Sequence, residues 1–190
     1  DMLELYGLSK ELGMEFATAA FHNSFYFHKY DNEITNAAEV TDNFCRLIDA
    51  QLKENNPKAW FRAYFNMGLV NYVNGGKRLL PCEAGSVNCF LDPWGEIYPC
   101  NGMEEGKWKL SMGNIRSGKS FEEIWNSPEA EEVRRHVANC PKNCWMVGTV
   151  SPVMKKNIIK PASWVLANKA RSVLGMKPKL SYEVRKTIES

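Results

Sequence analysis

The sequence has no apolar run long enough to cross a membrane and no charged, apolar, small-residue leader at its amino terminus. Its longest apolar runs, such as FATAAF and WVLA, fall far short of the roughly 20 residues that a spanning helix needs. Six cysteines among 190 residues are also too few for a small secreted scaffold held by disulfides. We therefore expect a cytoplasmic protein without a membrane partner. A hydrophobic fraction of 44% is enough to bury the core of one larger domain or two small ones.

Charge is distributed unevenly along the chain. The net charge is +2, but residues 149–190 hold nine Lys or Arg and only two Glu. Such a basic segment either steers an anionic partner or is the solvated face of a helix. We expect a basic helical tail that docks on the body, and no nucleic-acid partner. The apolar positions expected to dock are Leu166, Ala170, Val173 and Leu174.

The amino-terminal third has α/β character. Residues 1–12 carry leucines at helical spacing, and Gly13 suits the end of that helix. Met14–Phe21 is apolar throughout and predicts a strand buried on both faces. Two further helices are expected, at residues 36–54 and from Pro57 to the NGG at 74–76. A helix and a strand without a preceding strand predict the end of a larger α/β unit.

A β-hairpin is predicted for residues 86–100. Proline and glycine in the turn Asp92–Gly95 suit a type I turn. The side chain of Asp92 can accept hydrogen bonds from the backbone of that turn. A four-residue turn would pair Cys89 with Tyr98, and would place Cys89 diagonally beside Cys100.

Two capped helices are predicted after the hairpin. Ser120 and Glu123 form the pattern of a capping box, and Ser127 precedes a second helix that begins with proline. This second helix ends close to Cys140. Pro141 and Asn143 then favour an irregular loop that carries Cys140 and Cys144.

Four thiols from two distant pieces of chain predict one tetrathiolate site. The site suits zinc or an iron-sulfur cluster, because both prefer soft thiolate ligands. The intervals of 17, 39 and 3 residues are unlike the closely spaced pairs of a zinc ribbon. Cys89 remains an alternative to Cys82 at this point, and Cys45 is interpreted as a small packed hydrophobe. The expected ligands are Cys82, Cys100, Cys140 and Cys144.

The stretch from Cys82 to DPWGEIYPC, which ends at Cys100, resembles the C-x(9 to 15)-G-x4-C element of the SPASM accessory domain of radical S-adenosylmethionine (radical SAM) enzymes. GNIRSGKSFEEIWNSPEAEEVRRHVANCPKNC also resembles that domain, and the likeness covers residues 77–148. It favours Cys82 over Cys89, because only Cys82 has the required separation from Gly95. The resemblance implies an α+β fold: the end of a partial (β/α)6 barrel (1–76), a SPASM-like hairpin-plus-helices domain (77–148) and the tail (149–190).

The sequence departs from the two-cluster form of this family. Glu131 and Arg134 stand where its pattern has two further cysteines, so the resemblance implies a single auxiliary 4Fe-4S cluster. The C-x3-C-x2-C motif of radical SAM chemistry is missing, because Val147 occupies its third cysteine position. We therefore expect the carboxy-terminal part of a longer enzyme, inactive alone. The implied partners are its missing amino-terminal radical SAM region, which binds S-adenosylmethionine and a second 4Fe-4S cluster, a reductant protein, and a peptide or small-molecule substrate.

By the same resemblance, the loop after the expected strand lies near the adenosyl group. This makes His22, Asn23 and Ser24 candidates for contact with cofactor or substrate, and no catalytic residue is assigned. The cluster is expected to accept an electron during an oxidation or, alternatively, to order a region with a thin core. The competing hypothesis is a zinc-stabilised binding module that uses the same four cysteines.

Overall fold

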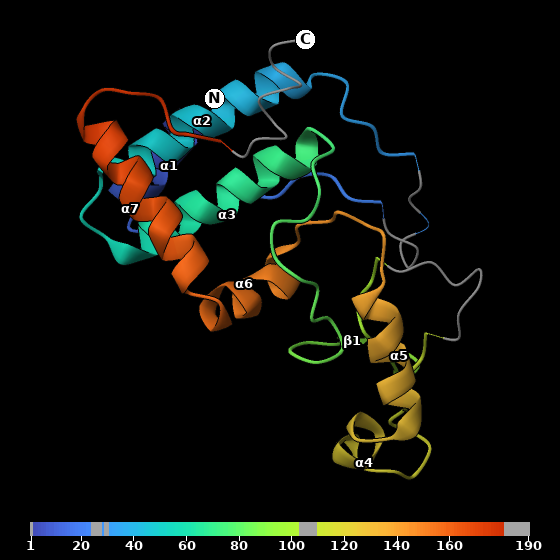
Figure 1. The fold of residues 1–190 in the computed structure, drawn as a ribbon. Coiled ribbons are helices and arrows are strands. Elements are labelled where there is room, and N and C mark those ends of the chain that lie inside the picture. The colour runs from blue at the N-terminus through green and yellow to red at the C-terminus, as the bar shows by residue number, and fades with distance from the viewer. Residues whose placement is uncertain (1, 24–27, 29–30, 103–109, 181–190) are drawn as a thin grey trace.

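The computed structural model describes residues 2–23, 28, 31–102 and 110–180. Its elements form two regions that are separate in Figure 1. The first, which we call the helical body, contains α1 (Met2–Glu11), α2 (Ala37–Lys53), α3 (Pro57–Val73), α6 (Val147–Lys156) and α7 (Ile159–Val173). The second, the cysteine lobe, is residues 82–145 and contains β1 (Phe90–Leu91), β2 (Glu96–Tyr98), β3 (Gly113–Asn114), α4 (Phe121–Trp125) and α5 (Pro128–Ala138).

The helical body is built around α2 and α3, and both predicted helices are confirmed. Phe44, Leu47 and Ile48 are buried on one side of α2, and Phe44 and Ile48 belong to a core that includes residues of α3. The side chain of Asn56 caps α3 by accepting a hydrogen bond from the Lys58 backbone N–H at 3.0 Å, just before the first-turn proline. Together with α6 and α7 these helices enclose the larger of two apolar cores.

The predicted strand Met14–Phe21 is wrong. Residues 14–23 have no regular secondary structure, and the one sheet in the described part of the chain has the order β1-β2-β3. Side chains still alternate along this stretch: Thr18 and Ala20 are half-buried against the body, whereas Phe21 is exposed. An apolar run becomes a strand only where a neighbouring strand satisfies its backbone groups. The described residues therefore show no part of a barrel.

The carboxy-terminal segment is helical and docks on the body, but through a different face from the predicted one. Val165, Asn168 and Ser172 are buried on α7, whereas all four predicted docking positions are exposed: Leu166, Ala170, Val173 and Leu174. The Ser172 hydroxyl donates to Asp49 Oδ1 on α2 at 2.6 Å. The polar residues Asn168 and Ser172 are thus part of the buried face of α7. A search for apolar positions alone does not find this face. Residues 181–190 of the predicted tail lie outside the described residues.

None of the helices in the described ranges combines the length and the hydropathy that crossing a bilayer would demand.

The hairpin is confirmed, but its predicted register is wrong by one residue. Phe90 pairs with Tyr98, and Leu91 pairs with Ile97. A β-turn is present over Asp92–Gly95, because the Gly95 N–H donates to the Asp92 carbonyl at 3.1 Å. Gly95 then adopts a left-handed φ of 91° and adds a bulge after the turn. A shift of one residue exchanges the two faces of a strand, so it changes where Cys89 points.

The rest of the cysteine lobe packs on this hairpin. Sequence analysis did not predict β3, where Gly113 lies so close to α4 that an added Cβ would stand 2.8 Å from Ile124. The capping box of Ser120 and Glu123 is confirmed, as is the Ser127 cap of α5. The structure is therefore rich in helix with a small antiparallel sheet, which is compatible with the predicted α+β class. The buried core of the lobe consists of Ile97, Met112, Ile124, Ala130 and Val133.

Candidate metal centre

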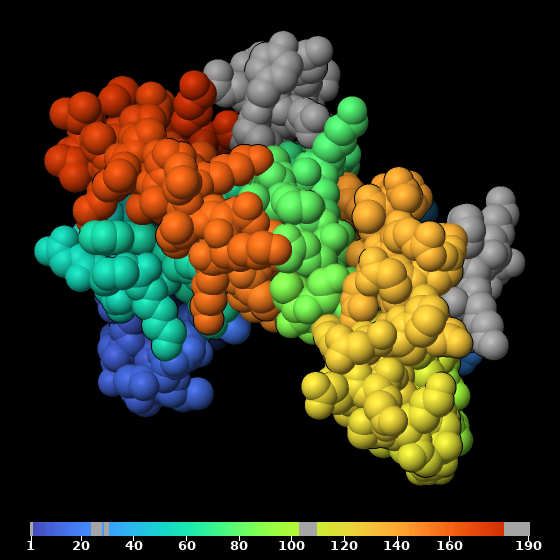
Figure 2. All heavy atoms as spheres, turned by 60° about the horizontal axis from the view of Figure 1, so that its bottom comes forward, coloured from blue at the N-terminus to red at the C-terminus, as the bar shows by residue number. Residues whose placement is uncertain are grey.

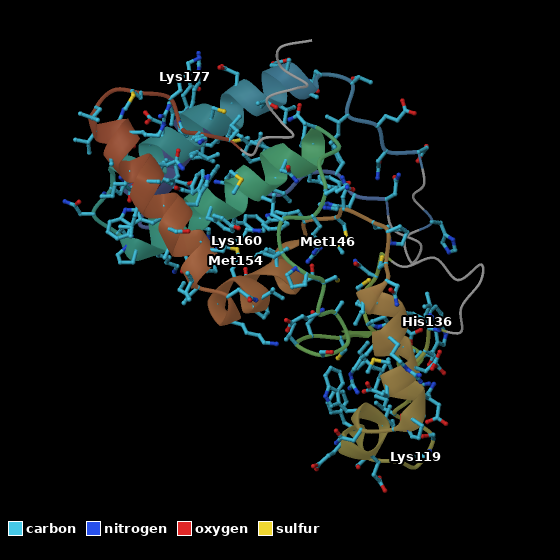
Figure 3. All side chains as sticks on the ribbon, in the orientation of Figure 1. Lys119, His136, Met146, Met154, Lys160 and Lys177 are labelled. Atoms are coloured by element: carbon cyan, nitrogen blue, oxygen red, sulfur yellow. The ribbon has the colours of Figure 1, made fainter. Side chains whose placement is uncertain are left out.

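Four of the six cysteines line one pocket where the two regions meet. Cys82 enters the lobe from the body, Cys100 follows β2, and the other two lie on the irregular loop after α5. Figure 2 shows the lobe, drawn in yellow and gold, joined to the body across the green atoms that follow α3. Met146 also lines the pocket, and Figure 3 shows it between the body and the lobe. The lining cysteines are Cys82, Cys100, Cys140 and Cys144.

The electrostatics of Cys144 reflect this convergence. Burial, with a smaller contribution from negative charge on the three other lining cysteines, raises the pKa of its thiol to about 11. The positive charge of Arg78 opposes these effects. The thiol therefore stays protonated in neutral solution, and a metal group that binds it must displace the proton.

The donor set fits an iron-sulfur cluster. The other described residues in the pocket lining include neither a carboxylate nor an imidazole, and several are small or apolar, such as Ala84, Gly102 and Val137. Such surroundings suit soft thiolate ligation and exclude water. Within the described ranges, no group of three or more His, Cys, Asp or Glu side chains is arranged to hold a single metal ion.

The two remaining cysteines lie elsewhere. The corrected hairpin register places Cys89 against the core of the lobe, and burial raises its pKa. It is not among the residues that line the cysteine pocket. Cys45 lies on α2 of the body, where burial raises its pKa to about 11. The ligand set itself stays a prediction, with the geometry favouring Cys82 over Cys89.

Trp145 anchors the cysteine loop to the body, a role that sequence analysis missed. Its side chain is 1% exposed, and its indole N–H donates to the Phe65 carbonyl on α3 at 2.8 Å. The indole lies directly on Gly68, where any Cβ would overlap it. Two residues earlier in the loop, Asn143 donates from its amide to the Gly76 carbonyl at 3.0 Å. Two features of the sequence could have drawn attention to this contact: a tryptophan directly after a cysteine, and a glycine inside a predicted helix.

His22 connects the extended amino-terminal segment to the same loop. Its ring stacks on Tyr72 with centroids 4.2 Å apart, and its Nε2 accepts a hydrogen bond from the Trp145 backbone N–H at 3.0 Å. Nδ1 lies 2.7 Å from the Ala20 carbonyl, to which it donates in this tautomer. Burial lowers the pKa of His22, although the bond to Ala20 opposes the shift. Both ring nitrogens are thus engaged within the protein.

Of the other two candidates for contact with a cofactor or substrate, only Asn23 lies within the described residues. The Asn23 side chain is exposed and accepts a hydrogen bond from the Asn32 backbone N–H at 3.0 Å. Ser24 lies outside the described residues. Contact of His22, Asn23 or Ser24 with a cofactor or substrate stays a prediction.

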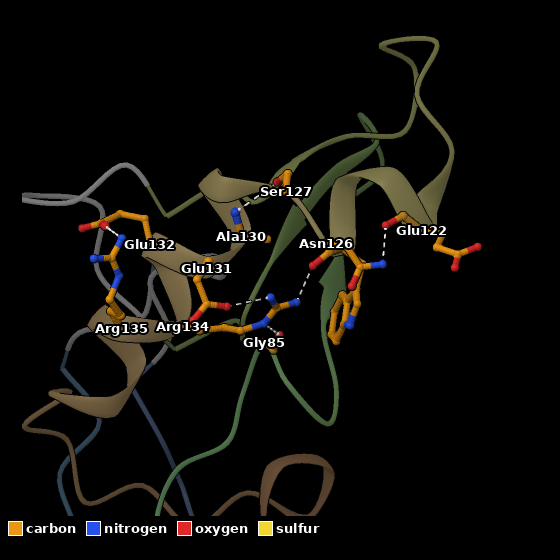
Figure 4. Close-up of polar contacts among 10 residues, drawn as sticks. Gly85, Glu122, Asn126, Ser127, Ala130, Glu131, Glu132, Arg134 and Arg135 are labelled. Atoms are coloured by element: carbon orange, nitrogen blue, oxygen red, sulfur yellow. Dashed lines mark hydrogen bonds and ion pairs between the residues drawn. The ribbon is translucent and has the colours of Figure 1, made fainter.

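An ion pair occupies the two positions where a second cluster would need cysteines. Arg134 Nη1 lies 3.4 Å from Glu131 Oε2 on the same helix (Figure 4). Arg134 also donates to the Gly85 carbonyl at 2.7 Å, and its guanidinium lies 4.9 Å from the centre of the Trp125 ring. These contacts hold the segment after Cys82 against α4 and α5. Arginine here has a structural role in shaping the lobe.

Comparison with known families agrees with this geometry. A family model described as SPASM, an iron-sulfur cluster-binding domain, matches residues 82–145. A SPASM iron-sulfur cluster-binding domain is thus found at residues 82–145, a range that includes β1, β2, β3, α4 and α5. Searches among curated proteins and among solved structures found no match.

Proposed function

We propose that the chain binds one 4Fe-4S cluster and forms the auxiliary-cluster part of a radical SAM oxidoreductase or maturase. The observation that carries this proposal is the convergence of four thiols on one pocket inside the matched SPASM domain. The ligands in this proposal are Cys82, Cys100, Cys140 and Cys144.

In this proposal, the residues around the thiols exclude water from the cluster and balance its charge. A bound cluster of this type supplies one-electron redox chemistry without offering an open ligand position to a substrate. Ala84, Val137 and Met146 would keep water from the sulfur atoms, while Arg78 and Lys142 would offset their negative charge. We therefore propose electron transfer as the role, with ordering of the lobe as a consequence of binding.

The proposed activity requires partners beyond this chain. The three-cysteine motif is not in the sequence, so we propose a radical SAM region that carries the catalytic cluster and S-adenosylmethionine. A reductant protein would supply electrons. A peptide or small molecule would be the substrate.

Metal analysis after anaerobic purification tests the proposal. We expect a brown protein with about four irons and four sulfides per chain. Replacing any one of the proposed ligands with Ala should empty the site, whereas Cys45→Ala and Cys89→Ala should leave its iron content unchanged. A colourless protein with stoichiometric zinc would support the zinc-stabilised binding module instead. Full iron in Cys82→Ala together with loss in Cys89→Ala would overturn the ligand assignment.

A further inference from the structure

Arg78 lies between the end of α3 and Cys82, at the boundary of the two regions. Its guanidinium carbon is 5.8 Å from the centre of the Trp145 ring. Its Nε donates to the Leu80 carbonyl at 3.0 Å, which fixes the plane of the guanidinium group. The side chain is therefore held toward the cysteine loop by contacts on both sides.

One outer nitrogen of Arg78, Nη1, faces the last cysteine of the loop. Nη1 donates to the backbone carbonyl of Cys144, and it also lies 3.9 Å from Cys144 Sγ, within the range of a weak N–H to sulfur hydrogen bond. Because arginine stays charged under all ordinary conditions, this contact brings a permanent positive charge to the sulfur.

The second outer nitrogen, Nη2, is buried and has no hydrogen-bond partner among the described residues. A buried charged donor without an acceptor is costly, so such a group generally marks a position where a further acceptor belongs. Cys144, which Nη1 contacts, shares its pocket with three other thiols, so a cluster bound there would bring anionic sulfur close to the guanidinium group.

We propose that Arg78 donates hydrogen bonds to sulfur at the cluster site and raises the reduction potential of that site. This inference rests on the proposed function. Reduction adds one electron, supplied by an external reductant, and neither breaks nor forms a covalent bond. The added negative charge strengthens the interaction with the guanidinium group, so the reduced state gains more than the oxidised state. Arg78 is a tuning residue in this account, not a catalytic one.

A redox titration of the cluster-loaded chain with dithionite, followed by electron paramagnetic resonance, tests the proposal. We expect Arg78→Gln to lower the ratio of reduced to oxidised cluster at a fixed potential by about tenfold, equivalent to about 59 mV for a one-electron couple. Arg78→Lys keeps the charge without the fork of donors and should give a smaller decrease. Arg46→Gln is the matched control, because Arg46 is an exposed arginine on α2 paired with Asp42. Its potential should equal that of the unmodified chain.

A structural role alone would reduce the amount of loaded cluster without changing the potential of the fraction that loads. An unchanged potential in loaded Arg78→Gln would therefore overturn the proposal while leaving the proposed function intact. A chain without iron would overturn both.

A measurement on the unmodified chain covers the case in which the variants do not load. Pulsed electron paramagnetic resonance of the reduced protein labelled with [15N]arginine should show coupling of the cluster spin to a guanidinium nitrogen. Absence of that coupling would overturn the proposal.

Discussion

The helical body and the cysteine lobe are stabilised by different means. The body encloses a continuous core shared by α2, α3, α6 and α7, whereas the buried apolar cluster described in the lobe is much smaller. The lobe compensates with local polar contacts, such as the capping box and the Arg134 clamp. Yet all four lining cysteines belong to the lobe, at the side where it meets the body. A small domain with a thin core gains most from bound metal, because binding free energy adds directly to folding free energy.

The largest expected effect comes from removing the cluster. We expect the lobe to lose amide protection on the order of 100-fold, since binding and folding are coupled there. Hydrogen exchange of the loaded and stripped chains would measure this at Ile97 and Ile124 in the lobe. Leu47 and Val70, both buried in the body, are the internal controls and should change little. Equal losses of amide protection in the lobe and in the body would contradict the claim that the cluster stabilises the lobe in particular.

The next effect concerns the contact between Trp145 and α3. An alanine at position 68 would place its Cβ inside the indole, so Gly68→Ala should lower the free energy of unfolding by about 1–3 kcal/mol. Gly7→Ala is the matched control, because Gly7 also lies in a helix but has open space around its Cβ position. It should raise the free energy of unfolding by about 0.5–1 kcal/mol. Urea unfolding compares the two, and equal effects would show that the indole does not rest on Gly68.

The smallest effect concerns the attachment of α1 to the rest of the body. Glu54 accepts hydrogen bonds from Tyr6 at 2.5 Å and from Lys10 at 2.7 Å. Burial alone would raise the pKa of Glu54, but these two bonds outweigh it and lower the pKa. A carboxyl with a depressed folded pKa stabilises the protein above its unfolded value, and this contribution is lost as the pH falls through the folded value.

Acid unfolding of Glu54→Gln measures this contribution. The variant should lose less than about 1 kcal/mol near neutral pH, because the contact is close to the surface. Its stability should also fall less steeply below about pH 4.3, the ordinary value for glutamate. Glu11→Gln on α1 is the control and should follow the unmodified chain. A control variant that flattens the acid profile equally would refute the assignment to Glu54.

Sequence patterns predicted the elements whose signals are local. The helix expected at residues 36–54 is α2, and the caps at Ser120 and Ser127 predicted α4 and α5. These features lie within a few turns of chain, so neighbouring residues alone determine them. The SPASM resemblance likewise rested on spacing within residues 77–148, and the family match supports it.

The predictions from sequence were wrong where a contact with residues far along the chain determines the local structure. Met14–Phe21 is as apolar as a strand but has no neighbouring strand in the described chain. The bulge at Gly95 shifted the hairpin register, and buried Asn168 and Ser172 turned α7 away from its most apolar stripe. The contact of Trp145 with Gly68 joins residues far apart in sequence, so neither the tryptophan beside a cysteine nor the glycine inside a helix identifies its partner.

Anomalous diffraction at the iron edge, from crystals grown without oxygen, tests the central claim most directly. We expect one four-iron cluster per chain, with its irons bound by the Sγ atoms of Cys82, Cys100, Cys140 and Cys144. An iron site bound by Cys89 in place of one of these, or an absorption edge that belongs to zinc, would contradict it.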